Sequence, residues 1–208
     1  MPVPSAPRSP DGLPEPGRFS HLHPDDGACL MEAAALLATG RLTDSPPGTH
    51  PVLAGLARAV NDAVGDTTRR ALWPLAADLA DARPADRAYG PLLVGTVVDA
   101  ARRVRPGSRR LRRHSTADHA RAARLARAGT PGRGARLADL LWWRGPGHHH
   151  LEHALRVLLT APDADARLAG LLRDAVAAAT GRSAQADHEQ AELVLLRGRR
   201  AGGGGARL

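Results

Sequence analysis

The sequence predicts an all-α protein: an irregular multi-helix bundle organised on an N-terminal helical hairpin, with disordered tails at both ends. Apolar residues recur at helical spacing in most segments, and no segment shows the alternation of apolar and polar residues that is typical of a strand. The hydrophobic fraction is 43% but aromatic residues make up only 2%, so Ala, Leu and Val must form the core. This composition favours helix over sheet.

Both ends of the chain are predicted to be tails. Residues 1–20 contain six prolines among small polar residues, and such a segment cannot build a core. Residues 198–208 include a run of four glycines. We therefore expect a single helical domain over residues 21–197, which is long enough to bury a core and includes an arginine-rich segment at residues 101–147.

A first helix is predicted over residues 27–39. Asp25 or Asp26 can cap its N-terminus, because a carboxylate accepts hydrogen bonds from the exposed N–H groups there and faces the positive end of the helix dipole. Gly40 suits the position just after the last helical residue. Apolar residues between these limits form one inward stripe.

A turn rich in Pro, Gly, Ser and Thr separates this helix from a second one, predicted over residues 52–64. Pro51 suits a first-turn position, where its missing N–H is not needed. The two helices form the hairpin, at about residues 25–64. Glu32 and Asn61 are the polar residues of this hairpin, and we expect their side chains to meet across it.

Further amphipathic helices follow along the rest of the chain, separated by segments rich in Gly and Pro. We expect a bend or restart near Pro74 and interpret Gly90-Pro91 and residues 145–147 as breaks. The predicted helices span residues 67–80, 92–104, 118–128, a short segment ending at Trp142-Trp143, 149–160, 163–180 and 183–196.

Three short runs resemble a recurrent group of short, uncharacterised actinobacterial proteins. These runs are Asp-Gly-Ala-Cys-Leu-Met-Glu at residues 26–32, His-Pro at residues 50–51, and Ala-Arg-Ala-Val-Asn-Asp at residues 57–62. The resemblance covers about residues 21–80. It implies a small helical domain and brings no established activity with it.

Positive charge is concentrated in the middle of the chain. The formal charge is +8, but residues 1–100 hold 8 arginines against 12 acidic residues, whereas residues 101–147 hold 13 against 2, a net +11. An acidic partner, either nucleic acid or protein, would therefore bind there. The candidate contacts are Arg109, Arg110, Arg112, Arg113, Arg121, Arg124 and Arg127. All 29 basic residues are arginines, which also fits the codon usage of a GC-rich genome, so a solvated basic face is the alternative.

Several potential metal ligands gather in the hairpin sequence, and a divalent metal would accept their imidazole and carboxylate groups together. Capping, pairing and packing explain the same residues without an ion, and we favour that interpretation because no spacing matches a specific zinc or iron signature. We therefore expect no cofactor. The candidate metal or polar seam comprises His23, Asp25, Cys29, Glu32, His50, Asn61 and Asp62.

A second group of ligand-type residues occurs at residues 148–153. His149 and His153 are four residues apart on one predicted helix face, beside Glu152, and two such imidazoles can chelate zinc or nickel. The order differs from His-Glu-x-x-His, and the sequence shows no third ligand. We interpret the pair as a surface cluster that binds metal adventitiously.

These observations favour a non-enzymatic helical binding or regulatory protein of the cytoplasm, whose arginine-rich segment engages an acidic partner. A single cysteine excludes an internal disulfide, no apolar run approaches the roughly 18 residues of a membrane span, and no signal peptide is visible. The alternative is a small metal- or cysteine-dependent enzyme that uses Cys29, Glu32 and His50 of the hairpin.

Overall fold

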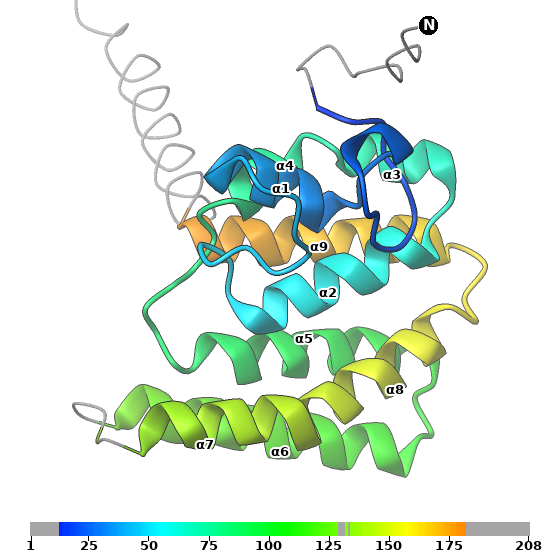
Figure 1. The fold of residues 1–208 in the computed structure, drawn as a ribbon. Helices are drawn as coiled ribbons and strands as arrows, with labels where there is room; N and C mark the ends of the chain where they lie inside the picture. The colour runs from blue at the N-terminus through cyan, green and yellow to red at the C-terminus, as the bar shows by residue number, and fades with distance from the viewer. Residues whose placement is uncertain (1–12, 129–131, 133, 182–208) are drawn as a thin grey trace, which may run out of the picture.

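A computed structural model describes residues 13–128, 132 and 134–181, and within them it confirms an all-α multi-helix fold (Figure 1). No helix in this part of the chain is long and apolar enough to cross a membrane. The predicted helix at residues 183–196 and the tail at residues 198–208 lie outside the described residues. The elements are η1 (Pro24–Asp26), α1 (Leu30–Thr39), α2 (Pro51–Ala63), α3 (Asp66–Leu72), α4 (Leu75–Leu79), α5 (Tyr89–Val104), α6 (Arg109–Arg127), α7 (Ala135–Trp142), the π-helical turn η2 (Trp143–Gly147), α8 (His148–Leu158) and α9 (Ala164–Thr180).

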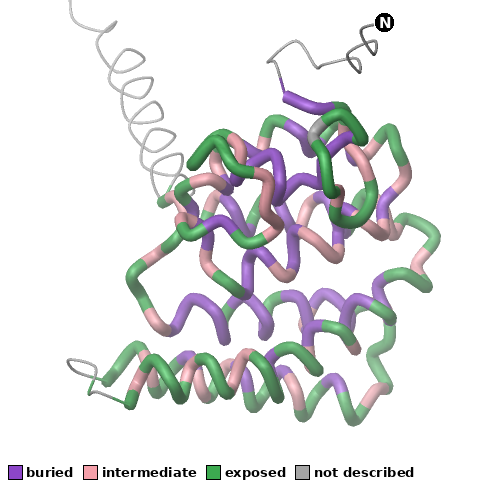
Figure 2. The backbone as a smooth tube through the Cα atoms, viewed as in Figure 1, coloured by how far each residue is buried: buried purple, intermediate pink, exposed green. Residues whose placement is uncertain are grey.

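Helix α5 lies at the centre of the bundle. It packs along α6 and α8, and it also contacts α2 and α9, so it joins the upper and lower helices of Figure 1. Helices α1 and α2 contact each other as the hairpin pattern predicts, and α1 also packs on α4. Figure 2 shows buried backbone running through α2, α5 and α9, whereas much of α6 and α7 is exposed.

The core consists mainly of Ala, Leu and Val side chains, as the composition predicts. Five of the ten residues of α1 are buried Leu, Met or Ala, and its other buried residue is Glu32. Alanine lets neighbouring helices approach closely, but its small side chain interdigitates little and so does little to fix the relative position of two helices. Directional polar contacts therefore matter more in this core than in one rich in aromatic residues.

The segment before the hairpin is ordered from residue 13, so the prediction of a disordered arm is wrong for residues 13–20. Leu13 is buried, and Gly17 N–H donates to the Ala28 carbonyl at 2.7 Å. Ala28 N–H in turn donates to the Glu15 carbonyl at 2.9 Å. The prolines of this segment are compatible with such an extended pairing, because its hydrogen bonds are donated by Gly17 and Ala28 and need no N–H from proline. The remainder of the predicted arm lies outside the described residues.

Helix α6 begins nine residues earlier than the sequence pattern suggested, at Arg109 instead of residue 118. Ser108 caps it, since its hydroxyl accepts a hydrogen bond from Leu111 N–H at 3.3 Å. Leu111 is the only apolar residue of the first turn and a half. The apolar period is therefore visible only when the whole helix is read together.

Two prolines that we interpreted as breaks lie inside helical structure. Pro91 is in the first turn of α5, where a missing N–H costs nothing. Pro146 lies in η2, whose wider turn continues α7 directly into α8. The restart predicted near Pro74 is confirmed, because α3 ends at Leu72 and α4 begins at Leu75.

We expect Gly48→Ala to destabilise the fold. Gly48 lies in the connection between α1 and α2, and a Cβ atom there would overlap the Ala80 carbonyl oxygen, which is backbone and cannot rotate away as a side chain can. Such overpacking costs about 1–3 kcal/mol. Gly170→Ala in α9 is the matched control, because its Cβ meets nothing within 4 Å and helix propensity favours Ala by about 1 kcal/mol. Urea unfolding measures both changes, and equal stabilities of the two variants would contradict this packing.

Candidate functional site

Glu32 is the centre of the polar seam at the start of α1. Its carboxylate is 2% exposed and accepts hydrogen bonds from Cys29 N–H at 2.8 Å and from His21 N–H at 2.7 Å. The His21 imidazole adds a third contact at 3.0 Å. Cys29 Sγ accepts from Glu32 N–H at 3.4 Å, which completes a capping box. Glu32 thus satisfies the exposed N–H groups of the helix start and of the segment before it.

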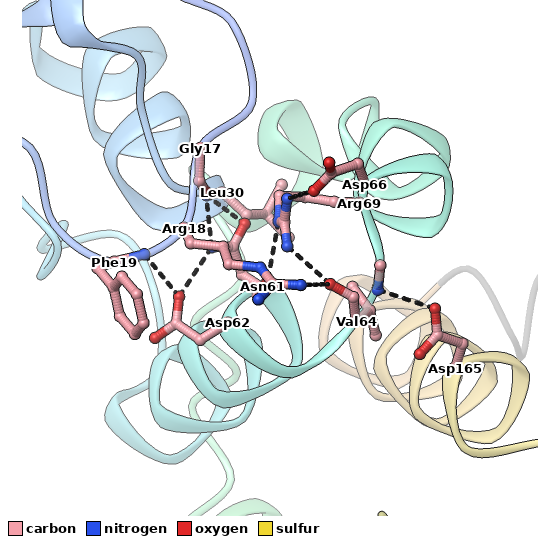
Figure 3. Close-up of polar contacts among 11 residues, drawn as sticks. Gly17, Arg18, Phe19, Leu30, Asn61, Asp62, Val64, Asp66, Arg69 and Asp165 are labelled. Atoms are coloured by element: carbon pink, nitrogen blue, oxygen red, sulfur yellow. Dashed lines mark hydrogen bonds and ion pairs between the residues drawn. The ribbon is translucent and has the colours of Figure 1, made fainter.

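Asn61 reaches the same helix end from α2, but not through Glu32, so the predicted pairing of these two side chains is wrong. Asn61 Oδ1 accepts from Leu30 N–H at 3.2 Å, and its Nδ2 donates to the Gly17 carbonyl at 2.9 Å (Figure 3). Each residue instead caps a different backbone group, because a helix start presents several unpaired N–H groups at once. Asp62 extends the contact by accepting from Phe19 N–H at 2.8 Å.

Arg69 is a buried residue of this seam that the sequence did not single out. It is 4% exposed and donates to the carbonyl oxygens of Asn61 at 2.9 Å and Val64 at 2.7 Å, which close the end of α2 (Figure 3). It also pairs with Asp66, and this hydrogen bond lowers the pKa of the Asp66 carboxyl. In the sequence, Asp66 and Arg69 look like an ordinary surface pair three residues apart.

The seam does not assemble the residues that an enzyme of the predicted type would need. Burial raises the pKa of the Cys29 thiol to about 12, so at neutral pH it is protonated and a poor nucleophile. His50 caps the opposite end of α2 from Asn61, about 16 Å away at 1.5 Å per residue. His23 and Asp25 form an exposed pair at 3.3 Å. Across the described residues, no group of three or more His, Cys, Asp and Glu residues is arranged to hold a metal ion.

The histidine cluster lies between α6 and α8 and is larger than the sequence suggested. His114 of α6 stacks on His150, with ring centroids 3.9 Å apart, and its Nδ1 lies 3.5 Å from Nδ1 of His153. His149 is also within ring contact of His114. His150 donates to the buried Asp118 carboxylate at 2.9 Å. Neither His114 nor Asp118 could be assigned to this cluster from chain position alone.

The cluster is uncharged in part at neutral pH. Burial, followed by the neighbouring His150 and His153 rings, lowers the pKa of His114 to about 4. Burial and the nearby Arg110 also lower the pKa of His153. Stacked neutral rings pack well, whereas protonated rings at this spacing would repel one another.

The inner side of α6 also faces α5 through Asp99. Ser115 donates to Asp99 Oδ1 at 2.7 Å, and His119 Nε2 contacts the other carboxylate oxygen at 2.8 Å. Ser115 and His119 share no hydrogen bond within the described residues, so the imidazole is not placed to take the hydroxyl proton directly. We interpret this set as a polar tie between the two helices.

The outer side of α6 carries an arginine face. Successive residues of a helix are turned by 100°, which places five arginines within one third of the circumference, opposite the buried Leu111 and Ser115. All five are exposed, and their guanidinium groups have no hydrogen bond or ion pair with another described residue. The arginine face consists of Arg109, Arg112, Arg113, Arg124 and Arg127.

Two of the predicted contact residues are engaged elsewhere. Arg121 faces α7, where it pairs with Asp139 at 3.0 Å and lies over the Trp142 ring, 5.2 Å from its centroid. Arg110 points toward α8 and contacts His149. These two side chains flank the arginine face without belonging to it.

Comparison of the chain with protein-family models, with curated proteins and with solved structures found no match. The resemblance of residues 21–80 to short actinobacterial proteins stays a prediction. What the protein does must therefore be argued from the sites described above: a polar seam, a histidine cluster and an arginine face.

We expect Glu32→Ala to destabilise the fold clearly, because it leaves the N–H groups of His21 and Cys29 buried without an acceptor. Each stranded buried donor costs about 1–3 kcal/mol. Glu15→Ala is the control, since the Glu15 side chain is exposed. Thermal unfolding followed by circular dichroism measures the effect, and melting temperatures that agree between the two variants would show that the seam is not structural.

We also expect stability to fall with acidification between about pH 6.5 and pH 4. The folded-state pKa of His114 is lowered from 6.5 to about 4, so in this window the unfolded chain binds more protons than the folded one. Stability is therefore complete above the unfolded pKa and is lost as pH falls toward the folded pKa. Urea unfolding across this range should show a shallower pH dependence for His114→Asn, whereas His23→Asn, outside the cluster, should behave as wild type.

Proposed function

We propose that this protein is a non-enzymatic binding protein whose arginine face engages the phosphate backbone of a nucleic acid. The observation that carries the proposal is the set of five exposed guanidinium groups on one side of α6 without acidic partners among the described residues. Arginine can bind a phosphate through two parallel hydrogen bonds, and each neutralised phosphate releases counterions. Surface ion pairs would neutralise such a face, and none of the ion pairs among the described residues involves these five arginines.

The shape of the face suits an extended polyanion. Arg109, Arg112 and Arg113 lie at one end of α6 and Arg124 and Arg127 at the other. The nearest members of the two groups, Arg113 and Arg124, are about 17 Å apart along the helix at 1.5 Å per residue. The outward positions between them are Thr116, Ala117, Ala120 and Ala123, which are small and uncharged. A long, straight ligand can therefore contact both groups without meeting a bulky or acidic side chain.

The position of the charges argues against a purely structural explanation. The first turn of α6 contains arginines and no acidic residue. The helix dipole favours acidic residues at this end, so arginines there cost some stability. A bound phosphate would reverse that cost, because it meets both the guanidinium groups and the positive end of the dipole.

Duplex nucleic acid fits this face better than a single strand does. Binding of single strands relies on aromatic side chains that stack on bases, and the arginine face has none. Trp142 and Trp143 are half-buried, and Trp142 is already covered by Arg121. Contacts to phosphates alone carry no sequence information, so binding should be independent of sequence.

An acidic protein surface is the alternative partner for the same face, since it presents carboxylates to the same guanidinium groups. The proposal needs no cofactor, and it places the protein in the cytoplasm, away from membranes. It differs from the enzyme alternative in requiring no reactive thiol, which agrees with the raised pKa of Cys29.

The test is fluorescence anisotropy with a labelled DNA duplex from about 50 to about 200 mM salt. We expect affinity to fall steeply with salt and to be weaker for a single strand of the same length. Replacing Arg109, Arg112 and Arg113 by Gln should weaken binding and reduce the log–log salt slope by about 0.9 for each phosphate that is no longer neutralised.

The matched control replaces Arg41, Arg70 and Arg173 by Gln. These exposed arginines lie outside α6, so the net charge changes equally while the arginine face stays intact. If both triple variants weaken binding equally, the loss of affinity follows from net charge alone, and the proposed site is wrong. An absence of binding at the lowest salt would exclude nucleic acid and leave an acidic protein as the partner.

A further inference from the structure

A cavity of about 650 Å³ lies on a different part of the molecule from the arginine face. It opens between α7 and the N-terminal ends of α2 and α5, with the connection at residues 83–87 along one side. Pockets of roughly 300–1,000 Å³ are typical of sites for small molecules. Its volume alone therefore suits a compact organic ligand.

Two indole rings belong to the apolar lining of this cavity, and each packs closely against a glycine. A Cβ atom on Gly55 of α2 would lie 2.7 Å from Trp143 Cζ2. A Cβ atom on Gly147 would lie 2.9 Å from the Trp142 ring. Both rings lie against backbone, are half-buried, and line the cavity together with Leu140. Arg121 lies over the Trp142 ring, 5.2 Å from its centroid, so it is Trp143 that can receive the ring of a ligand. Flat apolar surfaces fixed in this way suit a flat aromatic ligand.

His50 supplies one directed polar group. Its Nδ1 accepts from Val52 N–H at 3.2 Å, so in the neutral ring the proton is on Nε2. Burial, and then the charge of Arg83, lowers the pKa of His50 to about 4, so the ring is neutral at physiological pH. Nε2–H has no acceptor within the described part of the chain. It is therefore a hydrogen-bond donor available to a ligand in the cavity.

The rim of the cavity is positive. Arg87 is neutralised by Asp139, which accepts from its Nε at 2.7 Å and from its Nη2 at 3.0 Å. Arg83 donates to a backbone carbonyl and not to a carboxylate. Arg136 is exposed, and its guanidinium group has no hydrogen bond or ion pair with any other described residue. Asp86 also lines the cavity and accepts a hydrogen bond from Ala88 N–H at 2.8 Å, which does not neutralise its carboxylate. Three arginines and two aspartates therefore leave the lining with a net charge of +1.

We propose that this cavity binds a small aromatic carboxylate, with its ring against Trp143 and its carboxylate at Arg136. The His50 imidazole donates a further hydrogen bond to the ligand. The apolar lining and the unpaired Arg136 together indicate this ligand class. A neutral aromatic molecule would fit the apolar lining but would leave Arg136 without a partner. The site is independent of nucleic-acid binding, since it shares no residue with the arginine face.

The test uses naphthalene carboxylate and its uncharged analogue naphthalene carboxamide as probes of the full chain. Calorimetry measures the affinity of each compound directly. We expect the carboxylate to bind about tenfold tighter than the amide, the effect of one charge-assisted pair. Arg136→Gln should weaken carboxylate binding about tenfold and leave amide binding unchanged.

Two further variants sharpen the test. Arg173→Gln removes an exposed arginine outside both the cavity and the arginine face, and it should change neither affinity. His50→Asn keeps an acceptor for Val52 N–H, as Asn also caps helices, but loses the donor in the cavity, so both ligands should bind about fivefold more weakly. Absence of saturable binding of either compound, equal affinity for carboxylate and amide, or equal effects of Arg136→Gln and Arg173→Gln would overturn the proposal.

Discussion

The fold depends on three buried polar side chains around the start of α1 and the end of α2. Glu32 and Asn61 satisfy the N–H groups of α1, and Arg69 satisfies the carbonyl groups that close α2. A core of Ala, Leu and Val gains energy from burial in almost any relative position of its helices, because burial is not directional. We infer that these hydrogen bonds set the register of α1 and α2 and attach the segment before them.

Helix α6 performs two tasks on opposite sides of one cylinder. Its inner side meets α5 and α8 through leucine, serine, aspartate and histidine, and its outer side presents arginine to solvent. The inner contacts fix how the helix is rotated, so they also determine which arginines face outward together. The proposed binding surface is in this sense a product of the core, although no residue of the arginine face belongs to the core.

The sequence predicted the helical class and the central helices well, because apolar period and capping residues are local signals. It failed where the outcome depends on distant partners. Pro91 and Pro146 look like breaks, but their positions within a turn make them tolerable. Arg69 and His114 look like surface residues in the sequence. Only the tertiary fold brings Arg69 to the Asn61 carbonyl and His114 to the His150 imidazole. The concentration of positive charge in α6 could be predicted from the sequence, whereas the ion pair between Arg121 and Asp139 could not.

Helix α7 is attached in a way that sets it apart from the rest of the bundle. It contains no buried residue, and Asp139 links it at once to Arg87 and Arg121. Ion pairs at a surface weaken as dissolved ions screen them, while apolar packing does not. High ionic strength should thus loosen α7 first, as a local opening that exchanges amide hydrogens while the remainder stays closed. The side of the tryptophan-lined cavity that α7 forms would then be closed at physiological salt and loosened at high salt.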